Sequence, residues 1–148
     1  MPAVFLADEE ATLAFGAQLA QRAAAPRVIF RHGDFGGGKT TLIRGFLRGL
    51  GYQDKVKSPS YTLVESYPFP DKEVFHFDFY RIQNPQELEF MGIQDYWQPR
   101  AIFLIEWPEK GAAFLPEVDL ECYLTMAEPG REIRLEARTE KGKRVLLQ

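Results

Sequence analysis

The sequence predicts a three-layer α/β domain whose central sheet mixes parallel and antiparallel strands. Helix-like and strand-like segments alternate in the first half of the chain, and pairs of strands joined by turns follow in the second half. The segment Ala101–Ile105 is wholly apolar, which is typical of a strand buried on both faces of a parallel sheet. Because 148 residues suit one compact domain, we expect a single domain over residues 1–148.

Two strands and two helices are expected in the first third of the chain. Ala3–Leu6 suits a short strand, and Asp8 suits the N-cap of a helix that runs to about Ala24. Val28–Arg31 is a short run rich in β-forming residues. A second helix, which Gly51 can end, is expected because apolar residues recur at helical spacing. These apolar residues are Leu42, Ile43, Phe46, Leu47 and Leu50.

Two hairpins and a third helix are expected in the rest of the chain. Asn84, Pro85 and Glu87 form a typical helix start, and Gly92 is a suitable end. Turn-forming residues separate two pairs of β-forming segments, and each pair suits an antiparallel hairpin. The four segments are Tyr61–Tyr67, Glu73–Phe79, Asp119–Met126 and Glu132–Ala137.

The charge balance argues against a protein that holds nucleic acid by phosphate neutralisation alone. Such proteins are basic overall, whereas this chain has a formal net charge of −3. One local basic group is formed by Arg44, Arg48, Lys55 and Lys57, and we interpret it as a solvated helix face and loop.

The sequence indicates a cytoplasmic protein without a membrane segment. No apolar run approaches the length that spans a bilayer, and the first residues lack a basic segment followed by an apolar core. Cys122 is the only cysteine, which excludes an internal disulfide and a cysteine-based zinc site. Its alternating surroundings favour a buried, small hydrophobic role.

A phosphate-binding loop is the most specific motif in the sequence. Gly33–Thr40 has the pattern Gly-x-x-x-x-Gly-Lys-Thr, between an expected strand and an expected amphipathic helix. Backbone N–H groups of such a loop surround phosphate oxygens at close range, which requires glycines. We expect Lys39 to bind the β- and γ-phosphates, Thr40 to bind Mg²⁺, and Thr41 either to reach the α-phosphate or to cap the helix. The loop residues expected to bind nucleotide are Gly33, Asp34, Phe35, Gly36, Gly37, Gly38, Lys39, Thr40 and Thr41.

A site of this kind needs a carboxylate at the end of a neighbouring strand to hold magnesium directly or through water. Glu106 ends the apolar segment and is the first choice for the metal, and Asp78 ends a weaker version of the same pattern. Trp107 suits either a place against the nucleotide or the core. For His32 and His76 we favour packing or surface roles over a metal or base role.

Four segments together resemble the TsaE family, the small bacterial ATPases of threonylcarbamoyladenosine biosynthesis in tRNA. The resemblance extends from about Asp8 to Ala137. The segments are Gly33–Thr41, Ser58–Val64, His76–Arg81 and Ile105–Glu109. Mild departures from the family pattern are Phe35 and Phe79 in place of Leu, Gly37 in place of Ala, and Ser60 in place of Thr.

The resemblance implies a P-loop fold and a weak, Mg²⁺-dependent ATPase that supports two partners. These are TsaD, which transfers the threonylcarbamoyl group to the adenosine beside the anticodon, and its paralogue TsaB, so contact with tRNA would be indirect. The resemblance places Thr40 and Glu106 on magnesium and gives Asp78 a role in hydrolysis or the metal network. It also places Thr12 and Trp107 near the nucleotide, with Lys39 on the phosphates. Ser58, Ser60 and Thr62 would sense the γ-phosphate or form an ordinary turn.

Three other kinds of protein could use the same phosphate-binding loop. A small-molecule kinase usually carries an arginine-rich lid, and no such insertion is present. A GTPase switch would need an Asn-Lys-x-Asp segment to recognise guanine, and the sequence contains none, which favours ATP. A nucleotide-dependent binding module without turnover stays open, because the geometry of Glu106 and Asp78 decides whether hydrolysis is possible.

Overall fold

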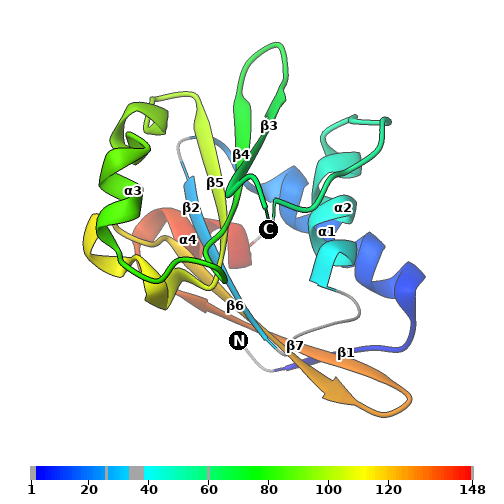
Figure 1. Cartoon of the computed structure of the whole chain (residues 1–148). Coiled ribbons are helices and arrows are strands. Elements are labelled where there is room, and N and C mark those ends of the chain that lie inside the picture. Colours follow the sequence, from blue (N-terminus) through cyan, green and yellow to red (C-terminus); the bar gives the residue numbers. More distant parts are fainter. Residues whose placement is uncertain (1–2, 26, 34–38, 60, 148) are drawn as a thin grey trace.

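The computed structural model describes residues 3–25, 27–33, 39–59 and 61–147. These residues form a seven-stranded sheet in the order β1-β7-β6-β2-β5-β4-β3 (Figure 1). The strands are β1 (Val4–Leu6), β2 (Arg27–Gly33), β3 (Val64–Pro68), β4 (Glu73–Asp78), β5 (Ala101–Glu106), β6 (Leu120–Ala127) and β7 (Gly130–Ala137). The helices are α1 (Glu9–Arg22), α2 (Lys39–Gly49), α3 (Gln86–Phe90) and α4 (Glu140–Leu147), with short 3₁₀ turns at Ile93–Tyr96, Pro108–Lys110 and Ala112–Phe114.

The centre of the sheet is parallel and its two margins are antiparallel. β6, β2, β5 and β4 run side by side in the same direction, whereas β1 and β7 on one margin and β3 on the other pair antiparallel. The predicted mixed sheet is therefore confirmed. In a parallel group the carboxyl ends of the strands meet at one edge, and chemistry in such sheets is usually found there.

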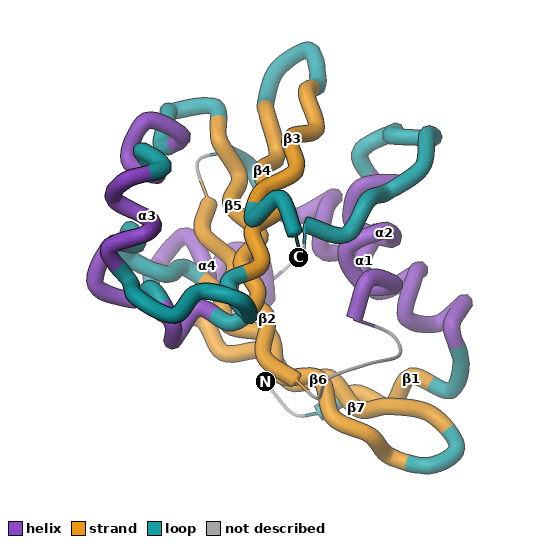
Figure 2. The backbone as a smooth tube through the Cα atoms, in the orientation of Figure 1, coloured by secondary structure: helices purple, strands orange, loops and turns teal. Residues whose placement is uncertain are grey.

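Two apolar clusters cover the two faces of the sheet and make three layers (Figure 2). Helices α1, α2 and α4 pack on one face, where Leu19, Phe46 and Val145 join the cluster. The short helix α3 and the 3₁₀ turns cover the other face, where Phe103 is fully buried. β5 is buried along its whole length, as the unbroken apolar run predicted.

Alternation along β4 agrees with the sequence prediction. Phe75 and Phe77 belong to the cluster under α3, and Val74 belongs to the cluster under α1 and α2. The β3–β4 and β6–β7 pairs are the two expected antiparallel hairpins. Cys122 is buried on β6, as expected of a small hydrophobic residue, and burial raises the pKa of its thiol to about 12.

Several boundaries differ from the sequence prediction, and one helix was missed. β3 begins at Val64 and not at Tyr61, because Leu63 has a left-handed backbone (φ 69°) and closes a turn by donating its N–H to the Pro59 carbonyl at 2.8 Å. α1 ends at Arg22, two residues earlier than expected. α4 was not predicted from the sequence, although its apolar side packs Val145 against the core.

The predicted helix caps are present. The backbone N–H of Ala11 donates to the Asp8 carboxylate at 2.9 Å, which confirms the N-cap of α1. At α3, the N–H of Gln86 donates to the Asn84 side chain, and the N–H of Asn84 donates to the Glu87 carboxylate at 2.9 Å. Regular α-helix begins one residue later than expected, at Gln86. Among the described residues, no helix is both long and apolar enough to cross a bilayer.

Glycines let α1 and α2 cross at very short range, which holds α2 against the sheet. A Cβ atom at Gly45 would lie 2.8 Å from the Cα atom of Leu13, and one at Gly16 would lie 2.8 Å from the Phe46 nitrogen. Both distances are shorter than van der Waals contact, so neither site has room for a side chain.

We expect Gly45→Ala to destabilise the protein by about 1–3 kcal/mol, because the methyl group must push the two helices apart. Alanine favours an isolated helix by only ~1 kcal/mol, which opposes the loss without cancelling it. Urea unfolding measures the difference, and Arg48→Ala on the exposed side of α2 is the control. Unfolding at the same or a higher urea concentration than the unaltered protein would contradict the close crossing.

Candidate functional site

The candidate site lies where β2 ends and α2 begins. β2 ends at Gly33 and α2 begins at Lys39, so the predicted strand and helix flank the glycine-rich segment. The expected ligands Asp34, Phe35, Gly36, Gly37 and Gly38 lie outside the described residues, as do the side chains of Lys39 and Thr40. At Gly33 the sheet itself requires glycine, because a Cβ atom would lie 2.5 Å from the Leu124 carbonyl oxygen of β6.

Strand register brings three charged side chains to one level of the sheet. Arg31 on β2 is opposite Glu106 on β5, and Glu106 is opposite Asp78 on β4. All three lie on the face covered by α1, α2 and α4, because Ile29, Leu104 and Val74 of the same strands belong to that cluster. The structure thus places the two predicted carboxylates side by side, next to the strand that leads into the glycine-rich segment.

Glu106 is buried and held from two sides. One carboxylate oxygen, Oε1, lies 3.2 Å from Nη1 of Arg31, and the other, Oε2, lies 2.8 Å from Nε2 of His76. Glu106 and His76 are each 1% exposed, and Arg31 is 5% exposed. Burial lowers the pKa of the Arg31 guanidinium, and the negative charge of Glu106 opposes that shift. Arginine keeps its charge under such conditions, so the interior holds a true ion pair.

The two oxygens of Glu106 are satisfied unequally. Oε2 has the hydrogen bond to His76. Oε1 has the charge of Arg31 nearby but no hydrogen bond from any described residue. A buried oxygen without a hydrogen bond retains lone pairs that can bind another ligand. Leaving such an oxygen without any ligand costs free energy.

Asp78 is fixed through the backbone around it. Its carboxylate accepts a hydrogen bond from the Tyr80 N–H at 2.9 Å, and it is 1% exposed. Its own N–H donates to the Leu63 carbonyl at 3.1 Å, and the next N–H, of Phe79, donates to the Glu106 carbonyl at 3.1 Å. Backbone hydrogen bonds therefore join the end of β4, which carries this carboxylate, to Leu63 before β3 and to Glu106 of β5.

Two residues other than glycine have positive φ among the described residues, and both adjoin these carboxylates. Leu63 has φ 69° and accepts the hydrogen bond from Asp78, and Trp107 has φ 57° and directly follows Glu106. Such conformations are unusual for bulky side chains and cost about 1–3 kcal/mol each. Strain of this kind concentrates at functional sites, which supports a functional role for this end of the sheet.

Thr12 and Trp107 line two different clefts. Trp107 packs on Tyr80 with ring centroids 5.1 Å apart and lines a cleft of about 70 Å³ with Gly33 and Glu109. Thr12 is buried and donates its hydroxyl to the Asp8 carbonyl at 3.2 Å. It lines a cleft of about 170 Å³ that includes Thr41 of α2 and the β6–β7 turn.

The segment with the predicted switch role lies beside the two carboxylates. Thr62 is exposed, Ser60 lies outside the described residues, and Ser58 is exposed. Tyr61 is 82% exposed, and the Arg81 guanidinium lies over its ring at 4.2 Å. The hydrogen bond from Asp78 to Leu63 joins the end of this segment to β4.

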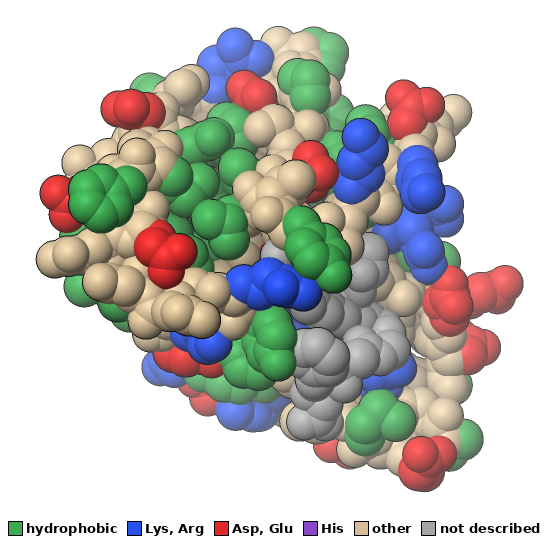
Figure 3. All heavy atoms as spheres, in the orientation of Figure 1, with side chains coloured by type: hydrophobic (Ala, Val, Ile, Leu, Met, Phe, Trp, Pro, Cys, Tyr) green, Lys and Arg blue, Asp and Glu red, His purple; other side chains and the backbone are tan. Residues whose placement is uncertain are grey.

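The basic group matches the prediction of a solvated face. Arg48, Lys55 and Lys57 are exposed, and Figure 3 shows Lys and Arg side chains over α2 and the loop after it. Arg44 forms a partly exposed ion pair with Glu9 at 2.6 Å.

The partners of Glu106 were not predicted from the sequence. His76 was expected to pack or to lie at the surface, and Arg31 received no role, whereas both contact Glu106 in the interior. The available signal was Arg31 at the end of the predicted strand Val28–Arg31, whose other residues are apolar, since buried charges in proteins are paired. The pairing itself depends on register between strands, and Arg31 and His76 lie 75 and 30 positions from Glu106 in the chain.

This fold, with a glycine-rich segment between a central parallel strand and a helix, is that of a P-loop NTPase-like α/β protein. The model of the TsaE family, described as threonylcarbamoyl adenosine biosynthesis protein TsaE, matches residues 6–135. The chain belongs to this family.

Individual relatives agree with the family assignment. The tRNA threonylcarbamoyladenosine biosynthesis protein TsaE of Haemophilus influenzae is 44% identical over 147 residues, which cover 96% of this chain and 93% of that protein. The protein of the same name from Nostoc is 35% identical over 134 residues, covering 88% and 82%. The crystal structure of Bacillus subtilis YdiB superposes with a TM-score of 0.83 at 25% identity and covers 99% of this chain and 91% of that one.

A double-mutant cycle tests the buried ion pair. We expect Glu106→Leu or Arg31→Met alone to cost about 3–5 kcal/mol of stability, because each leaves a buried charge without its partner. Because the double variant buries neither charge, its loss should be at least ~1 kcal/mol smaller than the sum of the two.

The exposed ion pair between Arg44 and Glu9 is the matched control for this cycle. Its coupling energy should be about 0.2–1 kcal/mol, since exposed pairs are screened by water. Urea unfolding of all the variants gives both coupling energies. Equal values for the buried and exposed pairs would show that Arg31 and Glu106 do not interact as described.

Proposed function

We propose that this chain is a Mg²⁺-dependent ATP-binding protein and weak ATPase that supports formation of threonylcarbamoyladenosine in tRNA. The observation that carries the proposal is the buried pair of carboxylates, Glu106 and Asp78, beside the strand that leads into the glycine-rich segment. P-loop sites need an acidic residue at this position to manage the charge of magnesium and phosphate.

Phosphate binding would use the start of α2. The unpaired N–H groups and the dipole of a helix N-terminus attract anions, and the glycine-rich segment ends there. Gly33–Thr41 would surround the phosphates, with the Lys39 ammonium on the β- and γ-phosphates.

The described residues fit a magnesium ion that also needs phosphate ligands. Oε1 of Glu106 receives no hydrogen bond from these residues, and the hydroxyl of Thr40 would be the second protein ligand. No described group of three or more His, Cys, Asp or Glu side chains would hold a metal by itself, which suits an ion bound together with a nucleotide. When bound, Mg²⁺ would neutralise charge on the β- and γ-phosphate oxygens.

Asp78 would position the attacking water or complete the metal network. One of its oxygens accepts the Tyr80 N–H, which fixes the orientation of the carboxylate. The segment with Ser58, Ser60 and Thr62 would approach the γ-phosphate, because its end is hydrogen-bonded to Asp78.

The two clefts would accept different parts of the nucleotide. The larger cleft has Thr12 and Thr41 on its walls and suits the nucleoside, since it adjoins the start of α2. Trp107 follows Glu106 directly and would lie on the γ-phosphate side.

Membership of the family supports a proposal for the partners and the location. The relatives are named for tRNA threonylcarbamoyladenosine biosynthesis, which supports a role with TsaB and TsaD in the cytoplasm. The net charge of −3 favours indirect contact with tRNA, through those proteins.

A hydrolysis assay with and without TsaB and TsaD tests the proposal. We expect Lys39→Ala and Glu106→Gln to lower the partner-stimulated rate at least tenfold. The first removes the positive charge that would stabilise the transferring phosphoryl group, and the second removes the carboxylate that would hold the magnesium ion. Glutamine keeps the volume of the buried side chain, and circular dichroism confirms the fold. Lys55→Ala, in the exposed basic group, should leave the rate unchanged. Wild-type rates in both site variants would refute the catalytic assignment.

One observation favours a second candidate, a nucleotide-dependent binding module without turnover. Glu106 is held by Arg31 and His76, as a purely structural buried ion would be. ATP binding with no hydrolysis, even with TsaB and TsaD present, would select this function. Transfer of phosphate to a small molecule would instead select a kinase.

A further inference from the structure

The row of residues on the helix-covered face contains one cationic and two acidic side chains. From β6 to β4 the register runs through Cys122, Arg31, Glu106 and Asp78. Cys122 contributes no charge near neutral pH, because burial raises the pKa of its thiol to about 12. Within these four described side chains, one guanidinium therefore lies beside two carboxylates, and their charges sum to −1 when both carboxylates are ionised.

His76 makes one directed contact with this row, to Glu106. Among the described residues, His76 has no other ionic partner. Glu106 as a carboxylate only accepts hydrogen bonds, so Nε2 of His76 carries the hydrogen in the 2.8 Å contact. Nδ1 of His76 is buried and has no hydrogen-bond partner among the described residues. The ring is thus held by one polar contact, to Oε2 of Glu106, and by the packing around it.

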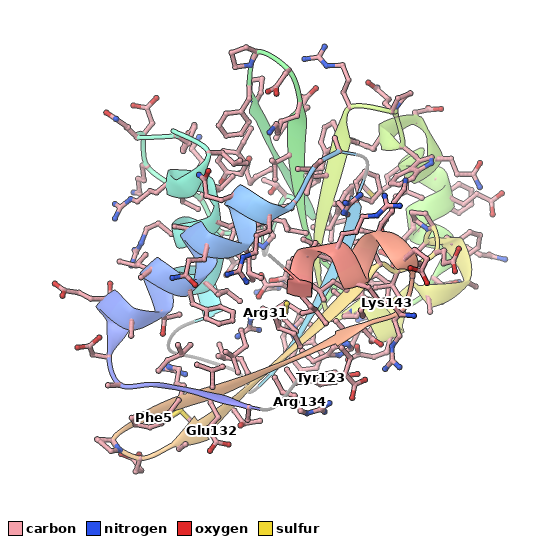
Figure 4. The ribbon with its side chains drawn as sticks, turned by 180° about the vertical axis from the view of Figure 1, so that it is seen from behind. Phe5, Arg31, Tyr123, Glu132, Arg134 and Lys143 are labelled. Carbon is pink, nitrogen blue, oxygen red and sulfur yellow. The ribbon has the colours of Figure 1, made fainter. Side chains whose placement is uncertain are left out.

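The two partners constrain Glu106 in different ways. His76 fixes one oxygen by a hydrogen bond with a defined direction, whereas Arg31 supplies charge to the other oxygen without a hydrogen bond. Figure 4 shows Arg31 in the interior, away from the exposed residues of β7 such as Glu132 and Arg134. This arrangement sets the rotamer of Glu106 and leaves Oε1 as the oxygen with capacity to accept a ligand.

We propose that His76 and Arg31 are positioning residues that orient Glu106 toward a nucleotide-bound divalent cation, an inference that rests on the proposed function. His76 holds the carboxylate so that Oε1 is presented, and Arg31 offsets part of the negative charge of the row before the cation arrives. In this role both residues act through Glu106 and not directly on the nucleotide or the metal. Groups that orient a metal ligand typically change metal affinity 10–100-fold when they are removed.

The distinguishing quantity is the gain in nucleotide affinity that magnesium provides. Calorimetry with ADP is carried out twice for each variant, once in excess EDTA and once in Mg²⁺. We define the magnesium gain as the dissociation constant in EDTA divided by that in Mg²⁺. This ratio measures the effect of magnesium separately from phosphate binding by the loop. A residue that supports only the fold would weaken both measurements alike, and a positioning residue would lower the ratio.

We expect His76→Leu to lower the magnesium gain about tenfold and to leave the affinity in EDTA unchanged, because the apolar side chain fills the space without donating a hydrogen bond. His76→Gln should restore most of the gain, since its amide nitrogen reaches about as far as Nε2. His76→Asn is shorter and should not restore it. If the leucine variant fails to fold, the glutamine and asparagine variants decide the question between them.

Glu121→Gln is the matched control. Glu121 accepts a contact of the same length, 2.8 Å, from the other histidine, His32, and lies on β6 outside the charged row. It should leave the magnesium gain unchanged. Arg31→Lys, which keeps the charge but alters its geometry, should lower the gain less than His76→Leu does.

The outcomes separate the two proposals. An unaltered protein that binds no ADP in either buffer, or binds it without a magnesium gain, would overturn the proposed function and this inference with it. A normal gain in the unaltered protein that persists in His76→Leu and His76→Asn would overturn the positioning role alone. Equal weakening in EDTA and in Mg²⁺ would also overturn it, because His76 would then support only the fold.

Discussion

The register of three parallel strands is the constraint on which the site depends. β2, β5 and β4 are aligned so that Arg31, Glu106 and Asp78 stand at one level and on one face. A slip of one residue in any strand would turn its charged side chain into the opposite apolar cluster. The apolar residues that alternate along these strands between the two clusters therefore fix the chemistry as well as the fold.

Burial of this row is tolerated because the charges compensate one another. An isolated ion in the interior is very costly, and an ion pair lowers that cost only when its hydrogen bonds are also made. Here the compensation is incomplete, since Oε1 of Glu106 receives no hydrogen bond from the part of the chain that the structure describes. A cation that binds to Oε1 would satisfy this oxygen, and removing the cost of the missing hydrogen bond would favour its binding.

The local parts of the site could be predicted from the sequence, and the long-range contacts could not. The glycine-rich segment, the strand before it and the place of Glu106 at a strand end follow from patterns within a few residues. The contacts of Glu106 with Arg31 and His76 depend on register between distant strands, which no local pattern records. The start of β3 was misplaced for a related reason, because the left-handed conformation of Leu63 depends on contacts with Pro59 and Asp78. α4 was missed because Val145 gains its burial only from tertiary packing.

The two strained residues show how the separate parts of the site are joined. Leu63 accepts a hydrogen bond from the N–H of Asp78, and the next N–H along the chain, of Phe79, donates to the carbonyl of Glu106. Consecutive amides at the end of β4 thus hold the segment before β3 on one side and β5 on the other. The hydrogen bond to β5 is made at Glu106, the residue just before the strained Trp107. Unfavourable backbone conformations persist only when their surroundings hold them, and the hydrogen bond from Asp78 is one of the contacts that hold Leu63.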